Sequence, residues 1–270
     1  RHGNGVFCAG TNGEFFALET AEKIAVAETC VAAAAGRAPV IAHIGEVSTG
    51  ATIALGKAVA KIGVAHAEPF TIVIRADGDI TSLEQLKLAP IDMGLKSSGT
   101  RQTALALFNI LGAKEQDIDL KSMANLPDAL CSKQIDAFAL VMGHPNRIVL
   151  DTAKRCAVSF LPIDGATRDQ LLKGVKYYQR SQVPARIYPG NLKATPTFAI
   201  AATLVTNATM PEESVYRLTK AMLTQQTKFN EQTYGYANMF HRARNKTGPV
   251  LSIEQHPGAA KYFEELKAAG

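Results

Sequence analysis

The sequence lacks any continuous apolar stretch of the roughly 20 residues that a membrane-spanning helix needs, and the Ala-rich run from Val31 to Ala35 is too short. Basic runs with interleaved aromatic residues are also missing, although the formal net charge is +5, which argues against a nucleic-acid-binding surface. What remains is a globular balance, with 47% hydrophobic and 20% charged residues. The 270 residues are enough for two lobes or one large α/β domain.

Signals for export, repeats and metal binding are likewise missing. The chain begins at Arg1 without a signal-peptide pattern, so we expect that any export signal was removed or lies outside this sequence. No internal repeat is visible, and neither His241 nor His256 has metal-ligand spacing. We therefore predict no metal and no cofactor.

Four cysteines are present and none forms a CxxC pair. Cys8 and Cys30 are expected to be buried free thiols, which is common for cysteine. Cys131 and Cys156 bracket one strand-loop-helix segment and are either free or joined in a disulfide. A disulfide would place the protein in an oxidising compartment.

The chain changes pattern close to residues 64–68. Residues 5–65 have the pattern strand, turn, helix, strand, turn, helix, which predicts a βαβα segment with parallel strands and a last helix at 51–63. From 67 onward strands alternate with polar loops and helices. We predict two segments, 1–66 and 67–270, and an α/β fold class.

The strongest candidate site is the loop Ser97, Ser98, Gly99, Thr100 and Arg101, between a strand end and a helix start. Free backbone N–H groups, hydroxyls and a guanidinium can converge there to hold a carboxylate or phosphate. The alternative is an ordinary N-cap with Arg101 exposed on the first turn of the helix.

A second candidate is the turn Gly143, His144, Pro145 and Asn146, which follows an apolar strand. Open α/β sheets gather ligands at the carboxyl ends of their strands, so the two loops can face one cleft. The alternative is a tight turn with a solvated His144. A catalytic triad cannot be argued, because no Ser or Cys nucleophile and no Asp lie near His144 in the sequence.

Seven motifs after residue 67 carry a resemblance: EPFTIVIRADGDITSLEQLK, SSGTRQTALALFNILG, ALCSKQIDAFALVMGHPN, YYQRSQVPARIYPGN, TPTFAIAATLVTN, PEESVYRLTKAM and HPGAAKYFEE. In this order they resemble the TAXI family of solute-binding proteins of TRAP transporters. The resemblance implies a periplasmic, monomeric, non-enzymatic protein with the two-lobed type II periplasmic-binding-protein fold. Its lobes would close over a small carboxylate such as glutamate and deliver it to membrane permease subunits.

The resemblance also implies which residues contact the ligand and which cysteines pair. The implied ligand-binding residues are Ser98, Gly99, Thr100, Arg101, Gly143, His144, Pro145, Tyr188 and Thr197, with Ser97 beside them. Cys131 and Cys156 resemble a cysteine pair found in part of the family.

Residues 3–66 resemble a different family, the dihydrodipicolinate synthase and N-acetylneuraminate lyase aldolases, through GTNGEFFALETAEK and APVIAHIGEVSTGATIALGKAVAKIG. This implies part of a TIM barrel in which Thr11 and Asn12 bind a substrate carboxylate. Lys96 could then be the Schiff-base amine of a pyruvate-dependent lyase. The YNxP strand that supplies the family's Tyr is absent, and an eight-fold barrel alone needs about 250 residues.

The two resemblances leave the nature of the chain open. Solute-binding proteins of the TAXI family begin with a TGGS-type loop that supplies half of one lobe's ligand contacts, and this loop is absent here. The chain is thus interpreted as a binding protein, with an aldolase-lyase or an inactive chimera as alternatives.

Overall fold

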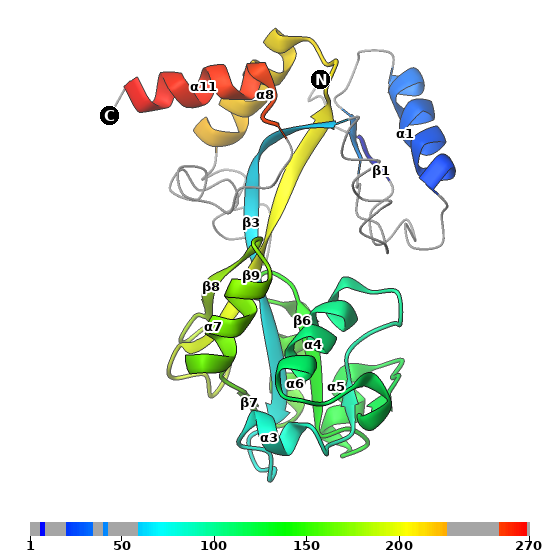
Figure 1. The fold of residues 1–270 in the computed structure, drawn as a ribbon, viewed down its shortest axis with the longest axis vertical. Helices are drawn as coiled ribbons and strands as arrows, with labels where there is room; N and C mark the ends of the chain where they lie inside the picture. Colours follow the sequence, from blue (N-terminus) through cyan, green and yellow to red (C-terminus); the bar gives the residue numbers. More distant parts are fainter. Residues whose placement is uncertain (1–5, 9–19, 35–39, 43–58, 226–253, 269–270) are drawn as a thin grey trace. The chain divides into compact units, whose positions relative to one another are not determined.

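A computed structural model describes residues 6–8, 20–34, 40–42, 59–225 and 254–268 (Figure 1). The chain divides into two compact units, each of which combines helices and strands, so the predicted α/β class is confirmed. Unit 1 contains residues 1–64, 203–225 and 251–270, and unit 2 contains residues 65–202 and 226–250. The unit boundary at 64/65 falls beside the change of pattern in the sequence, but unit 1 also takes two later segments.

Unit 1 begins with the predicted strand, helix and strand. These elements are β1 (Val6–Cys8), α1 (Thr20–Ala34) and β2 (Val40–Ala42). β1 and β2 pair in parallel, in register from Val6 with Val40 to Cys8 with Ala42. The βαβ part of the predicted N-terminal segment is therefore confirmed.

The helix predicted at 51–63 is wrong for its last five residues, which begin the strand β3 (Val59–Arg75). Ala60 and Ile62 are buried, whereas Lys61 between them is half-exposed. The alternation over these three residues fits a strand, and Ile62 packs in a cluster with Val215 and Ala259. The rest of the predicted helix lies outside the described residues.

Unit 1 also contains two helices, α8 (Glu212–Thr224) and α11 (Pro257–Ala268). They cross closely at Gly258, where a Cβ atom would lie 2.1 Å from the carbonyl oxygen of Glu212. Beside the crossing, Tyr216 and Lys220 both bind the carboxylate of Glu265.

Unit 2 contains a mixed sheet in the order β5-β4-β6-β3-β9-β8, with β7 paired to β3. β4 runs parallel to β5 and β6, while β3 runs antiparallel to β6 and β7. The strands besides β3 are β4 (Ile91–Asp92), β5 (Leu120–Lys121), β6 (Ala137–Val141), β7 (Val158–Phe160), β8 (Tyr178–Val183) and β9 (Thr195–Asn207).

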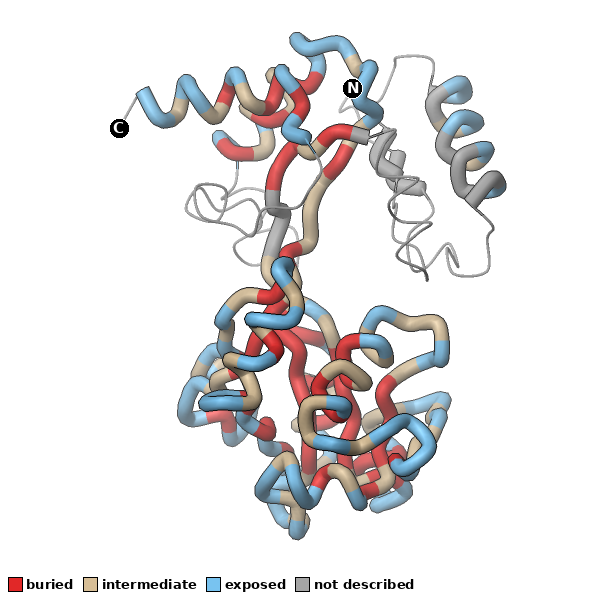
Figure 2. The backbone as a smooth tube through the Cα atoms, viewed as in Figure 1, coloured by how far each residue is buried: buried red, intermediate tan, exposed pale blue. Residues whose placement is uncertain are grey.

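Alternate residues of β3 and β6 face two separate cores. On one face Ile72 and Ala139 pack in a cluster with α4 and α7, and on the other Val73 and Phe138 pack in a cluster with α5 and α6. Figure 2 shows the buried strands in the interior of this unit, with half-buried and exposed segments around them. The helices are α3 (Leu83–Leu86), α4 (Gly99–Ile110), η3 (Glu115–Asp117), α5 (Leu126–Cys131), α6 (Arg147–Arg155) and α7 (Gly165–Gly174).

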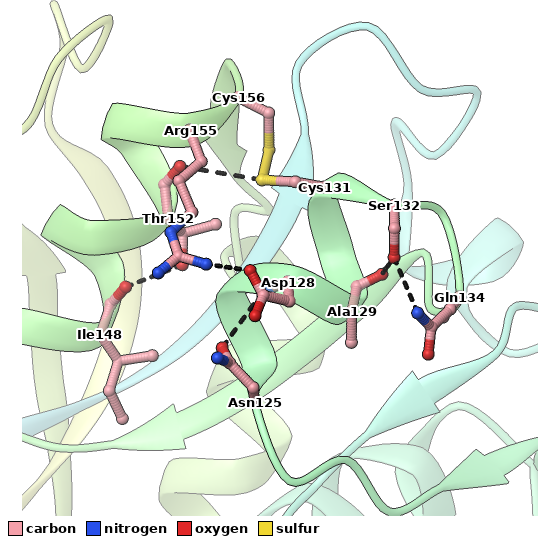
Figure 3. A network of polar contacts seen from close by, with 10 residues as sticks. All are labelled: Asn125, Asp128, Ala129, Cys131, Ser132, Gln134, Ile148, Thr152, Arg155 and Cys156. Carbon is pink, nitrogen blue, oxygen red and sulfur yellow. Dashed lines mark hydrogen bonds and ion pairs between the residues drawn. A yellow bond between two sulfur atoms is a disulfide. The ribbon is translucent and has the colours of Figure 1, made fainter.

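A disulfide joins Cys131 at the end of α5 to Cys156 directly after α6 (Figure 3). Their Cα atoms are 5.6 Å apart, which suits a disulfide, and this is the pair that the resemblance implies. Arg155 also forms an ion pair with Asp128 on α5. Cys30 is a free thiol as expected, although it is half-buried rather than fully buried.

Within the described ranges, no helix is both long enough and apolar enough to cross a membrane.

Candidate functional site

Three of the predicted site segments meet at the carboxyl end of β6. Thr100 Oγ1 accepts a hydrogen bond of 3.3 Å from the backbone N–H of Val141, the last residue of β6. Val141 pairs with Phe70 on β3, and the carbonyl of Phe70 accepts a hydrogen bond of 2.5 Å from Thr197 Oγ1. The loop before α4, the turn after β6 and Thr197 therefore share one end of the sheet.

Ser98 is the N-cap of α4, and its hydroxyl oxygen accepts a hydrogen bond of 3.1 Å from the backbone N–H of Arg101. The backbone N–H groups of Gly99 and Thr100 have no hydrogen-bond partner among the residues that the structure describes. The first N–H groups of any α-helix have no carbonyl acceptor within the helix, and these two lie at the positive end of the helix dipole. This end of α4 can therefore accept an anionic group.

Two residues that the sequence reasoning missed set the path of this loop. Asp92, at the end of β4, is buried and accepts hydrogen bonds of 2.7 Å from the backbone N–H groups of Gly94 and Met123. Gly94 has a φ of +78°, and a Cβ atom there would lie 2.9 Å from Ser98 Oγ. The sequence does contain a pattern that points to both residues: an acidic residue at the end of a predicted strand, followed two residues later by glycine.

Arg101 is placed differently from the expectation that its guanidinium is free for a ligand. Its Nη2 and Nε atoms lie 2.7 and 3.2 Å from Glu115 Oε1 on η3. The Arg101 side chain is only 15% exposed, so the pair is partly shielded from water. An anion that binds Arg101 has to share the guanidinium with Glu115.

His144 lies inside a hydrogen-bonded chain rather than in solvent. Its Nε2 atom is 2.8 Å from Thr71 Oγ1 on β3, and its Nδ1 atom is 2.6 Å from the Tyr188 hydroxyl. Burial lowers the pKa of His144 from 6.5 to about 4, so the ring is neutral at neutral pH. The alternative in which the His144 ring is solvated in a tight turn therefore does not hold, because both ring nitrogens bind side chains of the protein.

Tyr188 also binds the residue that starts α6. Its hydroxyl oxygen accepts a hydrogen bond of 2.6 Å from the backbone N–H of Asn146. Asn146 caps α6, because its side-chain oxygen accepts from the backbone N–H groups of Ile148 and Val149. Gly143 lies in the turn between β6 and Asn146, and the His144–Pro145 peptide bond is cis.

The remaining predicted residues are less informative. Ser97 is half-buried and precedes the cap of α4. Lys96 is exposed in the same loop, and its carbonyl accepts a hydrogen bond from Gln102. Thr11 and Asn12 lie outside the described residues. No cluster of His, Cys, Asp and Glu that could hold a metal ion occurs in the described ranges.

The N-terminal segment is similar to a family of aldolases. The sequence model of the dihydrodipicolinate synthetase family matches residues 2–71. The match supports the resemblance seen in the sequence, and it ends before Lys96.

Several solved structures are similar to this chain at low identity. The periplasmic aliphatic sulphonate binding protein SsuA of Escherichia coli is 13% identical, with 88% of this chain and 72% of that chain covered and a TM-score of 0.40. An ABC transporter periplasmic binding protein of Brucella ovis with glutathione bound is 11% identical, with coverages of 92% and 68% and a TM-score of 0.40. A substrate binding domain of a putative amino acid ABC transporter of Streptococcus pneumoniae is 14% identical, with coverages of 76% and 74% and a TM-score of 0.39.

Most of the chain matches one further family. The sequence model of the NMT1-like family matches residues 49–266, which include the loop before α4, the turn after β6, Tyr188 and Thr197. The chain therefore belongs to the NMT1-like family.

Proposed function

We propose that this protein is a solute-binding protein that captures a small carboxylate, such as glutamate, at the start of α4. The observation that carries the proposal is the pair of unpartnered backbone N–H groups of Gly99 and Thr100, at the end of the sheet where the other predicted site segments meet. Membership of the NMT1-like family, whose match spans these segments, supports a binding function for the whole site.

The donors at this site suit a carboxylate. The oxygens of Ser98 and Thr100 already accept backbone N–H groups, so each hydroxyl proton remains available for donation. Together with the N–H groups of Gly99 and Thr100 they give up to four donors, and an ionised carboxylate is a pure acceptor. The positive end of the α4 dipole adds to the attraction.

The proposed setting is the periplasm, with delivery of the solute to permease subunits of a TRAP-type transporter. The disulfide between Cys131 and Cys156 supports an oxidising compartment. The TRAP assignment follows from the resemblance of the sequence motifs from residue 67 onward. In this proposal the solute-binding protein is a monomer without a cofactor.

A thermal-shift panel tests the proposal. The probes are L-glutamate, L-glutamine and succinate, with inorganic phosphate and methanesulfonate as anions of other classes. A carboxylate at about 100 times its Kd should stabilise the protein by about 2.7 kcal/mol. A response to phosphate or methanesulfonate alone would replace the carboxylate with that class of anion, and no response to any probe would contradict the proposal.

A pyruvate-dependent lyase is the second candidate, because residues 2–71 match the dihydrodipicolinate synthetase family. This reaction needs an imine between Lys96 and pyruvate, which borohydride reduces to a stable adduct. Intact mass spectrometry after treatment with pyruvate and borohydride detects that adduct. Its absence from Lys96 excludes this mechanism.

A further inference from the structure

His144 bridges two parts of unit 2 through both of its ring nitrogens. Nε2 binds Thr71, which is 2% exposed and lies on β3, and Nδ1 binds Tyr188, which is 5% exposed and lies between β8 and β9. The Tyr188 ring packs in turn on Phe160 of β7, with ring centroids 5.5 Å apart. Both ring nitrogens are therefore occupied within the protein, which leaves neither for a direct hydrogen bond to a ligand in this arrangement.

The side chains of Tyr188, His144 and Thr71 form a series of hydrogen bonds in which each group can donate to the next. The backbone N–H of Asn146 can only donate, so the Tyr188 oxygen accepts from it and the Tyr188 hydroxyl proton can go to Nδ1 of His144. A neutral ring that accepts at Nδ1 carries its proton on Nε2 and donates it to Thr71 Oγ1. The Thr71 hydroxyl proton then reaches the carbonyl oxygen of Pro69 at 3.3 Å.

The tautomer with the proton on Nδ1 of His144 fits this series of hydrogen bonds less well. With the proton on Nδ1, both His144 and the backbone of Asn146 would donate to the same phenol oxygen. With the proton on Nε2, the hydrogen bonds named above are consistent with one another, because the Tyr188 and Thr71 oxygens each accept one of them and donate another. The geometry therefore favours a single neutral tautomer.

We propose that Thr71 and Tyr188 are positioning residues that fix His144 as one neutral tautomer, with the proton on Nε2, and thereby fix the turn Gly143–Asn146 before a ligand binds. The role of this turn in binding rests on the proposed function, whereas the tautomer does not. Tyr188 holds the turn twice, at the His144 ring and at the backbone of Asn146, where α6 begins. In this role Tyr188 acts through the turn rather than by touching the solute.

Nitrogen-15 NMR of the histidine rings in the ligand-free protein at neutral pH tests the tautomer. His144→Gln assigns the signals of His144 among the six histidines. The expected signature is a pyridine-type Nδ1 and a pyrrole-type Nε2. Averaged signals from two tautomers, or a proton on Nδ1, would overturn the proposal.

Three variants test the positioning residues. Tyr188→Phe keeps the ring that packs on Phe160, and Thr71→Val keeps the shape of the side chain, but each removes one hydroxyl, so each should change the His144 signature toward mixed tautomers. Thr71→Ser restores the hydroxyl and should preserve the signature. An unchanged signature in both Tyr188→Phe and Thr71→Val would contradict the proposal.

Titration with L-glutamate separates this proposal from the proposed function. If L-glutamate binds, Tyr188→Phe should weaken its affinity by about tenfold or more, because the substitution removes both hydrogen bonds between Tyr188 and the turn, and tenfold corresponds to roughly 1.4 kcal/mol. An unchanged affinity beside a changed His144 signature would overturn the link to binding. If the wild-type protein does not bind L-glutamate, the proposed function loses support while the NMR result still decides the tautomer.

Discussion

At the scale of single residues, His144 makes the stability of the protein depend on pH. Its pKa is about 4 in the folded protein and 6.5 in the unfolded chain. As the pH falls through 6.5 the unfolded chain takes up a proton that the folded protein excludes until about pH 4. The contribution of His144 to the free energy of unfolding is therefore fully present above pH 6.5. It falls by about 3 kcal/mol between pH 6.5 and pH 4.

Urea denaturation of the wild-type protein and His144→Gln at several pH values checks this prediction. Because the other titrating groups are common to both proteins, the difference between the two free energies of unfolding isolates His144. That difference should change by about 3 kcal/mol between pH 7 and pH 4. Parallel curves for the two proteins would show that His144 titrates normally when folded.

The ion pair between Arg101 and Glu115 predicts a gain of affinity from a substitution. Glu115→Gln removes the negative charge that now pairs with the guanidinium and leaves Arg101 available to an anion. We expect carboxylate binding to tighten by a few fold in Glu115→Gln and to weaken in Arg101→Ala, because partly exposed ion pairs contribute about 1 kcal/mol or less. Calorimetric titration measures both, and equal affinities in all three proteins would show that Arg101 does not contact the ligand.

Gly94 is a position where the backbone requires glycine. Gly94→Ala combines a left-handed φ with a Cβ atom 2.9 Å from the N-cap oxygen of Ser98, and should destabilise the protein by about 1–2 kcal/mol. Gly174→Ala is the matched control, because no atom lies within 4 Å of its Cβ position. Thermal unfolding should show a lower midpoint for Gly94→Ala only.

At the scale of elements, the disulfide closes the loop that carries the candidate turn. It spans a sequence separation of 25 residues, and the loop between Cys131 and Cys156 contains β6, the turn with His144 and α6. Closing a loop of this length stabilises a protein by about 3 kcal/mol, mainly by restricting the unfolded chain. The disulfide therefore stabilises the part of unit 2 that presents the turn.

Replacing Cys131 and Cys156 together with Ser should lower the free energy of unfolding by about 3 kcal/mol. Cys30→Ser is the control, since Cys30 is a free thiol and its replacement should change little. Chemical denaturation with and without a reducing agent measures both effects. A double variant as stable as the oxidised wild-type protein would contradict the prediction.

The elements of unit 2 were largely predictable, because their signals are local. Ser98 and Gly112 mark the start and end of α4, and the apolar run from Ala137 to Val141 gives β6. The strand at Val59–Gly63 was missed because Ala60 and Lys61 continue the helix-like pattern of the preceding residues, and its strand form depends on packing with Val215 and Ala259, more than 150 positions later. Local patterns cannot supply such contacts.

The candidate site was predicted in part for the same reason. Caps and turns identified the loop before α4 and the turn after β6. The pairing of Arg101 with Glu115 and the chain from Thr71 through His144 to Tyr188 join residues from separate elements. Their geometry follows from the order of strands in the sheet, which the spacing of residues does not fix.

At the scale of the whole molecule, the chain combines two family matches. Residues 49–266 match the NMT1-like family and residues 2–71 match the dihydrodipicolinate synthetase family, so the matches overlap at 49–71. The strand β3 crosses the end of this overlap and contributes Phe70 and Thr71 to the candidate site. The start of α4 lies within the NMT1-like match and outside the other match. The binding function proposed for the protein depends most on the hydrogen-bond donors at this helix start.

The most direct test of that claim compares two substitutions of Gly99 by calorimetric titration with the carboxylate that gives the largest thermal shift. Gly99→Pro removes one unpartnered N–H at the first position of α4, where proline is tolerated, and the extended backbone of Ser98 suits a following proline. Gly99→Ala keeps the N–H and adds only a methyl group, with no atom within 4 Å. The account predicts that both variants fold, that Gly99→Ala binds like the wild-type protein and that Gly99→Pro binds about tenfold more weakly or worse. Equal affinity in Gly99→Pro and Gly99→Ala would contradict it.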